Sequence, residues 1–304
     1  MTTTHDERLL NPATSMGAVT LRVGDLERMS AYYSDAFAME PVQERAAGQE
    51  VHRVLGRGRT PLVRMIHAPD LPFGDQRQAG LFHTAFLFED RASLAATVYR
   101  AARSREGQFL GSSDHLVSEA FYFTDPEGNG VELYTDRPRD RWVLDGKQVR
   151  MASDRLDPNE YLGTHLSRAT VDAGPALPGV VGHVHLQVGD IATAKSFYVD
   201  ALGFEITQSG YPGALFASAG GYHHHVAMNT WNSRGAGPRA ARLGLGNVAV
   251  TVPGTDDISA LRARLVARSI PFAGDSRTIS AHDPWGTRVT VSVPDLTPDE
   301  LLTH

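Results

Sequence analysis

The chain has no cysteine among its 304 residues. This absence excludes disulfide bonds, thiolate metal sites and a cysteine nucleophile, so a metal site would need His, Asp, Glu or backbone oxygen ligands. The chain also lacks a block of Lys and Arg and has a formal net charge of −6. These features argue against a nucleic-acid partner. No apolar run approaches the ~20 residues that a membrane-spanning helix needs.

The N-terminal segment MTTTHDERLLNPATSMG has no positive start followed by an apolar stretch. It therefore does not have the pattern of a secretory signal, and we expect a cytoplasmic protein with no membrane partner. Hydrophobic residues make up 41% of the chain and charged residues 21%, which suits a globular protein with a full core. The 13 histidines are an ample supply of metal ligands.

The second half of the chain repeats the first. Three pairs of segments align: Val19–Leu26 with Val184–Ile191, Gly80–Ala85 with Gly244–Ala249, and Asp125–Gly128 with Asp283–Gly286. Each half contains two copies of a unit made of a strand, a helix and further strands. The repeat predicts an α+β fold of four βαβββ units.

The pattern also predicts where the elements lie. Helices are expected over about Leu26–Phe37 and Arg91–Arg105, with short strands around Val51–Leu55 and Pro61–His67. The N-terminal pair of units would span residues 11–136 and the C-terminal pair residues 179–294. Residues 137–178 would form a crossing linker, and a short helix is expected in the tail from about Pro294.

Histidines hold the same position in two different units. Side chains alternate along a strand, so His183, His185 and Gln187 share one face, while the aliphatic side chains between them must pack under the helix. The histidine face is therefore free to line a cavity. In the second unit His83 holds the register of His183, and in the fourth unit Asn247 holds it.

A carboxylate lies at the corresponding last strand of the second unit. The stretch Asp114–Tyr134 predicts a strand, a tight turn and a strand, with Glu132 facing away from the aliphatic residues beside it. In the fourth unit Thr290 holds this register. Two imidazoles and one carboxylate form the facial arrangement of non-haem Fe(II) oxygenases. A lone strand histidine is usually structural and a lone glutamate usually solvated, so the hypothesis depends on the three sharing one register.

Three further histidines, His223, His224 and His225, lie in a predicted apolar strand. Alternation puts His223 and His225 on one face and His224 on the other, so at least one is expected to face a polar cavity. A rim of solvated imidazoles is the alternative. His115 and Tyr122 would face opposite ways in an unbroken strand, and a bulge would be needed to bring both to one site.

Four motifs resemble the vicinal oxygen chelate superfamily and, more narrowly, the two-domain catechol 2,3-dioxygenases (type I extradiol dioxygenases). They are GLFHTAF, DHLVSEAFYFTDPEGNGVELYTDRP, VGHVHLQVGD and GGYHHHVAMNTW. The resemblance covers about residues 17–293. It implies metal ligands His83, Glu132 and His183, catalytic roles for His225, Tyr122 and His115, and substrate contacts from His185, His223 and Asn229.

In familiar members of this family the whole metal triad lies in the C-terminal half, whereas here its residues are divided between the halves. A complete site therefore requires the second unit to pair with the third and the first with the fourth. The resemblance implies extradiol cleavage of a catechol-type aromatic diol by O2 with Fe(II), or Mn(II), in aromatic compound degradation. The exposed edges of the units favour a homo-oligomer. Alternatives are a hydroquinone-cleaving relative, a glyoxalase-type metal-dependent lyase or isomerase, and a non-catalytic protein that binds an aromatic ligand.

Overall fold

The computed structural model describes residues 8–47 and 50–294 and confirms the α+β class. Each unit has one helix between its first strand and three further strands. The first unit contains β2 (Val19–Val23), α1 (Leu26–Phe37), β3 (Glu40–Ala47), β4 (Glu50–Arg57) and β5 (Thr60–His67). The second contains β6 (Gly80–Phe88), α2 (Arg91–Arg103), β7 (Gln108–Asp114), β8 (Ser118–Thr124) and β9 (Gly130–Asp136).

The second half repeats this order. The third unit contains β13 (Val180–Gln187), α5 (Ile191–Tyr198), β14 (Glu205–Gln208), β15 (Ala214–Ser218) and β16 (Val226–Asn229). The fourth contains β17 (Gly244–Thr251), α6 (Thr255–Ala267), β18 (Phe272–Gly274), β19 (Thr278–His282) and β20 (Arg288–Ser292). In every unit the last strand lies parallel to the first.

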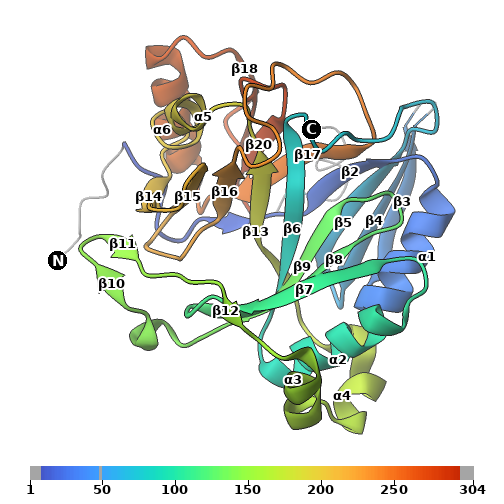
Figure 1. The fold of residues 1–304 in the computed structure, drawn as a ribbon. Coiled ribbons are helices and arrows are strands. Elements are labelled where there is room, and N and C mark those ends of the chain that lie inside the picture. Colours follow the sequence, from blue (N-terminus) through green and yellow to red (C-terminus); the bar gives the residue numbers. More distant parts are fainter. Residues whose placement is uncertain (1–7, 48–49, 295–304) are drawn as a thin grey trace.

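Two large sheets join units from different halves of the chain. The first and fourth units form one sheet, called the 1–4 sheet, and the second and third units form the other, called the 2–3 sheet. The 1–4 sheet has the order β18-β19-β20-β17-β2-β5-β4-β3, with β1 (Ser15–Met16) paired to β17. The 2–3 sheet has the order β12-β7-β8-β9-β6-β13-β16-β15-β14, where β12 (Asp154–Arg155) comes from the segment between the halves. At the middle of each sheet the first strands of two units pair antiparallel, β17 with β2 and β6 with β13. Figure 1 shows β6 and β13 side by side in the middle of the molecule.

The residues between the halves form short elements. These are the 3₁₀ helices η1 (Arg139–Arg141) and η2 (Gly174–Ala176), the hairpin of β10 (Leu144–Asp145) and β11 (Gln148–Val149), β12 (Asp154–Arg155), α3 (Pro158–His165) and α4 (Arg168–Ala173). Strand β12 extends the 2–3 sheet by pairing with β7. This segment is therefore more than a connection, because it adds a strand to one edge of that sheet.

Several local expectations differ from the structure. The strand β3 was not predicted, because its exposed, charged side chains give no alternating pattern. The helix expected to reach Arg105 ends at Arg103, where the extended backbone of Ser104 terminates it. The helix expected from about Pro294 lies largely outside the described residues.

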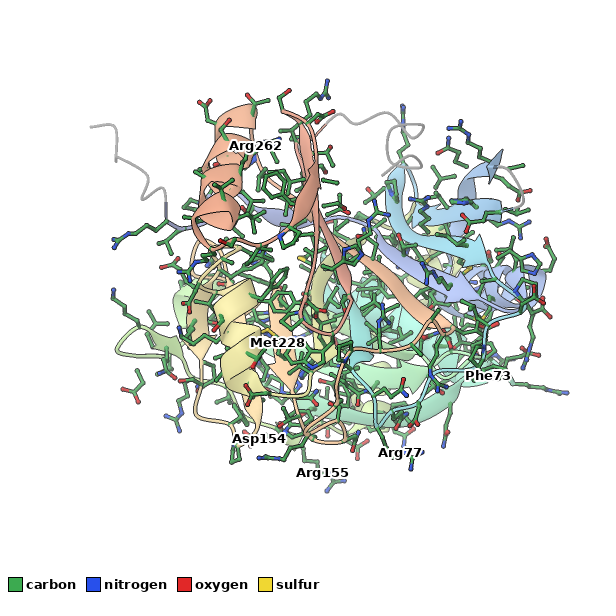
Figure 2. The ribbon with its side chains drawn as sticks, turned by 90° about the horizontal axis from the view of Figure 1, so that it is seen from above. Phe73, Arg77, Asp154, Arg155, Met228 and Arg262 are labelled. Atoms are coloured by element: carbon green, nitrogen blue, oxygen red, sulfur yellow. The ribbon has the colours of Figure 1, made fainter. Side chains whose placement is uncertain are left out.

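One core of apolar side chains occupies the inner faces of both sheets and the helices. Val184 and Leu186 of β13 and Val131 and Leu133 of β9 belong to this core, so their neighbours along each strand must face the other way. Figure 2 shows the buried interior and the exposed edge of the molecule from above, with Met228 of β16 inside and Arg77 and Arg155 projecting from the edge.

A buried tyrosine–aspartate pair occurs at the same place in each half. The Tyr33 hydroxyl of α1 donates to Asp125 Oδ2 at 3.1 Å, and the Tyr198 hydroxyl of α5 donates to Asp283 Oδ2 at 2.9 Å. In both turns the other carboxylate oxygen accepts two backbone N–H groups. Burial raises the pKa of Asp125 to about 6 although these hydrogen bonds lower it. Each pair joins a helix of one unit to the turn of the next.

We expect Tyr33→Phe and Tyr198→Phe each to lower the free energy of unfolding by about 1–3 kcal/mol, because each leaves a buried carboxylate short of a donor. Urea denaturation followed by circular dichroism measures the change. Tyr99→Phe is the matched control, since the Tyr99 hydroxyl has only a long, exposed contact with Arg103. Equal stability of all three variants would show that the buried pairs do not join the units.

Candidate functional site

The antiparallel pairing of β6 with β13 brings histidines from the two halves together. His83 lies opposite His185, and His183 lies opposite Ala85. On the other side of β6, the parallel strand β9 puts Glu132 opposite Ala85. All three predicted metal ligands therefore flank one small residue, which leaves space between their side chains.

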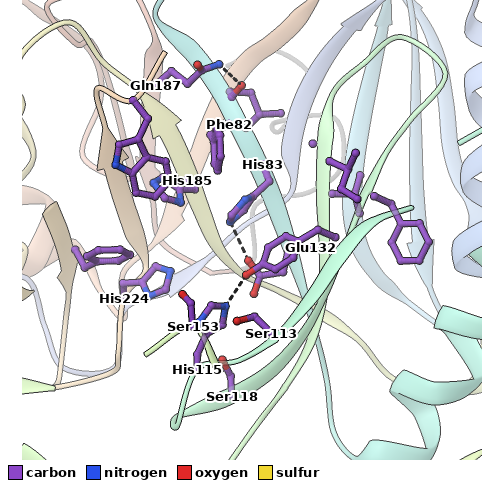
Figure 3. A pocket seen from close by; sticks show the side chains of 18 of the residues that line it. Phe82, His83, Ser113, His115, Ser118, Glu132, Ser153, His185, Gln187 and His224 are labelled. Carbon is purple, nitrogen blue, oxygen red and sulfur yellow. Dashed lines mark hydrogen bonds and ion pairs between the residues drawn. The ribbon is translucent and has the colours of Figure 1, made fainter. Parts of the chain in front are cut away.

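Glu132 stands between the two imidazoles. Its Oε2 lies 2.9 Å from His83 Nε2 and 3.2 Å from His183 Nε2. All three residues are buried, with exposed fractions of 3%, 6% and 1% for Glu132, His83 and His183. Figure 3 shows His83 and Glu132 approaching each other from neighbouring strands.

The environment favours a charged carboxylate beside a neutral imidazole. Burial by itself would raise the pKa of Glu132, but His183 and His83 outweigh it and hold that pKa well below the usual range. Burial lowers the pKa of His183 to about 4, against the opposing effect of Glu132. At neutral pH His183 therefore keeps a free lone pair, which a metal ligand requires.

The donor set fits a divalent metal. One ligand atom from each of His83, Glu132 and His183 lies within 4.8 Å of the others. His83 Nε2 is buried and has no hydrogen-bond partner of suitable geometry within the described part of the chain, despite its short distance to Glu132. A bound cation would satisfy this orphaned nitrogen and the carboxylate together.

A second cluster of potential ligands lies beside the first. It consists of His183, His223 and His224, whose ligand atoms also lie within 4.8 Å of one another. Both nitrogens of His223 are already engaged, because its Nδ1 lies 2.8 Å from His224 Nδ1 and its Nε2 lies 3.0 Å from Asp136 Oδ1. This leaves His223 without a free ligand atom, so the cluster with Glu132 is the better metal site.

The run of histidines is not in a strand. His223, His224 and His225 precede β16 in an irregular segment, so strict alternation does not apply to them. His224 lines the cavity, and its ring centroid lies 4.0 Å from that of His183. The ring of His225 instead packs against Tyr222, and its Nδ1 accepts the N–H of Ala219 at 3.1 Å. The structure thus brings His224, and not His225, to the site.

His115 and Tyr122 meet without a bulge. A turn at His115–Val117, in which Leu116 has φ 68°, separates β7 from β8, so the expected unbroken strand does not exist. The Tyr122 hydroxyl lies 2.6 Å from His115 Nε2, and His115 Nδ1 lies 2.6 Å from the carbonyl oxygen of Ala152. Burial and Glu132 raise the pKa of Tyr122 well above its usual value.

The predicted substrate-contact residues are only partly at the cavity. His185 lines it, and His185 Nε2 lies 2.9 Å from Asn229 Nδ2. Asn229 is fully buried behind His185, and its Oδ1 accepts the N–H of Trp231. His223 lies behind His224 and does not line the cavity. Asn229 and His223 are therefore placed to orient cavity residues.

The cavity has a volume of about 580 Å³ and combines polar and apolar walls. Its aromatic walls include Phe82, Phe216 and Trp231, whose ring centroids lie 4.9, 5.8 and 5.4 Å from that of His185. Sequence reasoning missed these residues and also Met151, Ala152 and Ser153 of the segment between the halves. Of these residues, only Phe82, in the GLFHTAF motif, and Trp231, the last residue of GGYHHHVAMNTW, lie in the motifs that the sequence singled out.

The equivalent positions in the 1–4 sheet hold no potential metal ligands. There the Thr290 hydroxyl donates to Asn247 Oδ1 at 2.9 Å, and Ser280 bonds to the same hydroxyl. None of the helices within residues 8–47 and 50–294 combines the length and apolar character that crossing a lipid bilayer requires.

Comparison with known proteins agrees with this architecture. The family model for the Glyoxalase/Bleomycin resistance protein/Dioxygenase superfamily matches residues 15–133 and 180–302. A catechol-2,3-dioxygenase of Bacillus subtilis (strain 168) is 34% identical over 282 residues, which are 91% of this chain and 92% of that protein.

Two solved structures share the fold at low sequence identity. A putative dioxygenase from Bacillus subtilis has a TM-score of 0.62 at 11% identity, covering 94% of this chain and 87% of that one. Glyoxalase I from Zea mays has a TM-score of 0.57 at 17% identity, covering 96% and 95%. The resemblance seen in the motifs is therefore confirmed, and the chain belongs to the Glyoxalase/Bleomycin resistance protein/Dioxygenase superfamily.

Proposed function

We propose that this protein is an extradiol dioxygenase that cleaves a catechol-type aromatic diol with O2 at a 2-His-1-carboxylate Fe(II) site. His83, His183 and Glu132 would hold the metal. The observation that carries this proposal is the convergence of Glu132 Oε2 with the Nε2 atoms of both histidines beside an aromatic-walled cavity. The 34% identity to a catechol-2,3-dioxygenase over most of both chains supports the same reaction class.

A bound Fe(II) would supply a Lewis acid and a template for the diol and O2. Mn(II) accepts the same imidazole and carboxylate ligands. A glyoxalase-type lyase would be expected to add a second carboxylate ligand, but the ligand clusters within the described residues contain only Glu132 as an acid. The dioxygenase is therefore the function that the donor set supports best.

The apolar walls would bind and orient the aromatic ring. Phe82 and Trp231 pack edge-on against His185, which fixes the direction in which these rings face. Holding a flat substrate between such walls aligns its two oxygens with the polar end of the cavity and lowers the entropic cost of reaction. A bound ring would exclude water from these apolar walls, which strengthens the polar contacts at the buried end of the cavity.

Tyr122 and His115 would receive a proton from the diol. His115 Nδ1 can satisfy the carbonyl of Ala152 only by donating, so in the neutral ring Nε2 is the acceptor for the Tyr122 hydroxyl. As Tyr122 gives its proton to His115 Nε2, its oxygen can take one from a substrate hydroxyl. The pair would thus form a short proton path from the cavity to the half-buried His115, in the turn between β7 and β8.

His224 would hold or move a proton at the opposite wall. Asp136 accepts from His223 Nε2, so His223 Nδ1 accepts from His224 Nδ1, and His224 Nε2 is left unprotonated. Burial and the neighbouring imidazoles lower the pKa of His224 well below 6.5, which keeps it neutral at physiological pH. It is therefore a base that can take a substrate proton and later return it.

The first prediction concerns the metal ligands. His83→Ala, His183→Ala and Glu132→Ala should each lower oxygen uptake with catechol by at least about 100-fold, because loss of a residue that only hydrogen-bonds a metal ligand already costs about 10–100-fold in metal sites. Metal content of the purified variants should fall in parallel, as measured by mass spectrometry. His165→Ala, on α3 and not among the residues that line the cavity, is the histidine control. Full uptake in all three ligand variants would refute the metal site.

The second prediction separates two adjacent histidines. His224→Gln should lower kcat by about 100-fold or more, the usual contribution of a general acid or base, with the metal retained. His225→Gln should keep a kcat close to that of the wild type, since its ring faces Tyr222 rather than the cavity. The reverse result would restore the sequence-based assignment to His225.

The third prediction tests the proton path. Tyr122→Phe and His115→Gln should each lower kcat about 10-fold or more, and the double variant should be no slower than the slower single variant, because the two act as one unit. Steady-state oxygen uptake at several pH values provides the measurement. Effects that multiply in the double variant would mean that the two residues act independently.

A further inference from the structure

The 1–4 sheet has a cavity of its own on the face that corresponds to the proposed active site. Its volume is about 490 Å³. Its walls include Thr20 of β2 and Asn247 of β17, which hold the places of His185 and His83 in the repeat. This cavity shares no lining residue with the proposed active site, so a ligand bound here would be a separate one.

Four arginines from four segments line this cavity. Arg22 comes from β2, Arg64 from β5, Arg288 from β20, and Arg239 from the segment before β17. None of the described residues that line the cavity is acidic. The remaining walls contain neutral polar groups and the apolar side chains of Ile66, Pro271 and Phe272.

Three of these arginines have neutral hydrogen-bond partners among the described residues. Arg64 Nη2 lies 2.6 Å from His52 Nδ1, Arg288 Nε donates to Ser280 Oγ at 3.0 Å, and Arg239 Nη2 donates to the carbonyl of Leu245 at 2.7 Å. Arg22 is exposed and makes no hydrogen bond or ion pair with the described residues. Arg239 and Arg288 use one N–H group each in these bonds, so each guanidinium has further donors to offer.

Two acids that do not line the cavity act on the arginines. Asp283 acts on Arg239 from the turn before β20, where Tyr198 holds it. Glu50 acts on Arg64 from beyond His52. Burial and the charge of Arg288 lower the pKa of Arg64 to about 10. No acid among the described residues lines the cavity that these guanidinium groups share, so an anion bound there would meet only positive and neutral groups of the described walls.

We propose that this arginine pocket, lined by Arg22, Arg64, Arg239 and Arg288, binds a small organic anion with carboxylate or phosphate groups. Planar guanidinium groups bind both kinds of oxyanion through charge-assisted, often bidentate hydrogen bonds. Ile66 and Phe272 would contact the carbon skeleton of the ligand. The two halves of the fold would then use one template for two ligands, a metal-bound diol in the 2–3 sheet and an anion in the 1–4 sheet.

Isothermal titration calorimetry with inorganic phosphate and, separately, with succinate tests this proposal, with NaCl holding the ionic strength constant. We expect saturable binding of at least one probe to the wild-type protein. Phosphate binding alone would indicate a phosphorylated ligand, and succinate binding alone a carboxylate. Arg22→Gln and Arg288→Gln should each weaken binding by about 10-fold or more, because a charge-assisted contact is lost.

Two further variants make the outcome decisive. Arg168→Gln removes an exposed arginine on α4 that is paired only loosely with Asp172 at 3.7 Å, and it should leave the affinity unchanged. His83→Ala alters the proposed active site and should also leave it unchanged. Arg22→Gln is the safer pocket variant, because that exposed side chain has no folding role among the described contacts. Absence of saturable binding, equal weakening in Arg168→Gln, or loss of binding in His83→Ala would each overturn the proposal.

Discussion

The antiparallel pairing of β6 with β13 is the constraint on which the candidate site depends. Backbone hydrogen bonds across this pair fix the register, and a shift by one residue would turn every side chain of one strand to the other face. His83 and His183, which are separated in the sequence by the rest of the second unit and the segment between the halves, are thereby held beside Ala85. Glu132 reaches the same place through the parallel pairing of β9 with β6.

The two sheets show how one backbone template supports different chemistry. In both sheets the aliphatic faces of the central strands pack into the common core, so the opposite faces are free to vary. In the 2–3 sheet this face carries imidazoles and one carboxylate, a donor set suited to a divalent cation. In the 1–4 sheet it carries guanidinium groups. The buried Tyr33–Asp125 and Tyr198–Asp283 pairs maintain the shared frame.

The metal-ligand candidates could be predicted because they lie within regular strands. His83, His183 and Glu132 follow strict alternation, so the repeat alone gave their common register. The resemblance implied a catalytic role for His225, and the run His223–His225 was expected to lie in a strand, whereas the structure has an irregular segment there that turns His224 to the cavity. The relation between His115 and Tyr122 could not be predicted for a related reason. A turn at Leu116 replaces the expected continuous strand and brings both side chains to the cavity.

The sequence by itself determined the four-unit repeat, the α+β class and the residue types available to bind a metal, because these follow from local periodicity and composition. Only the tertiary structure decided which histidine of the run meets the cavity, which residues of the segment between the halves close it, and where the arginines gather. Those features depend on turns and on contacts between distant segments. No local pattern encodes them, since the energy of each contact exists only after the sheets have formed.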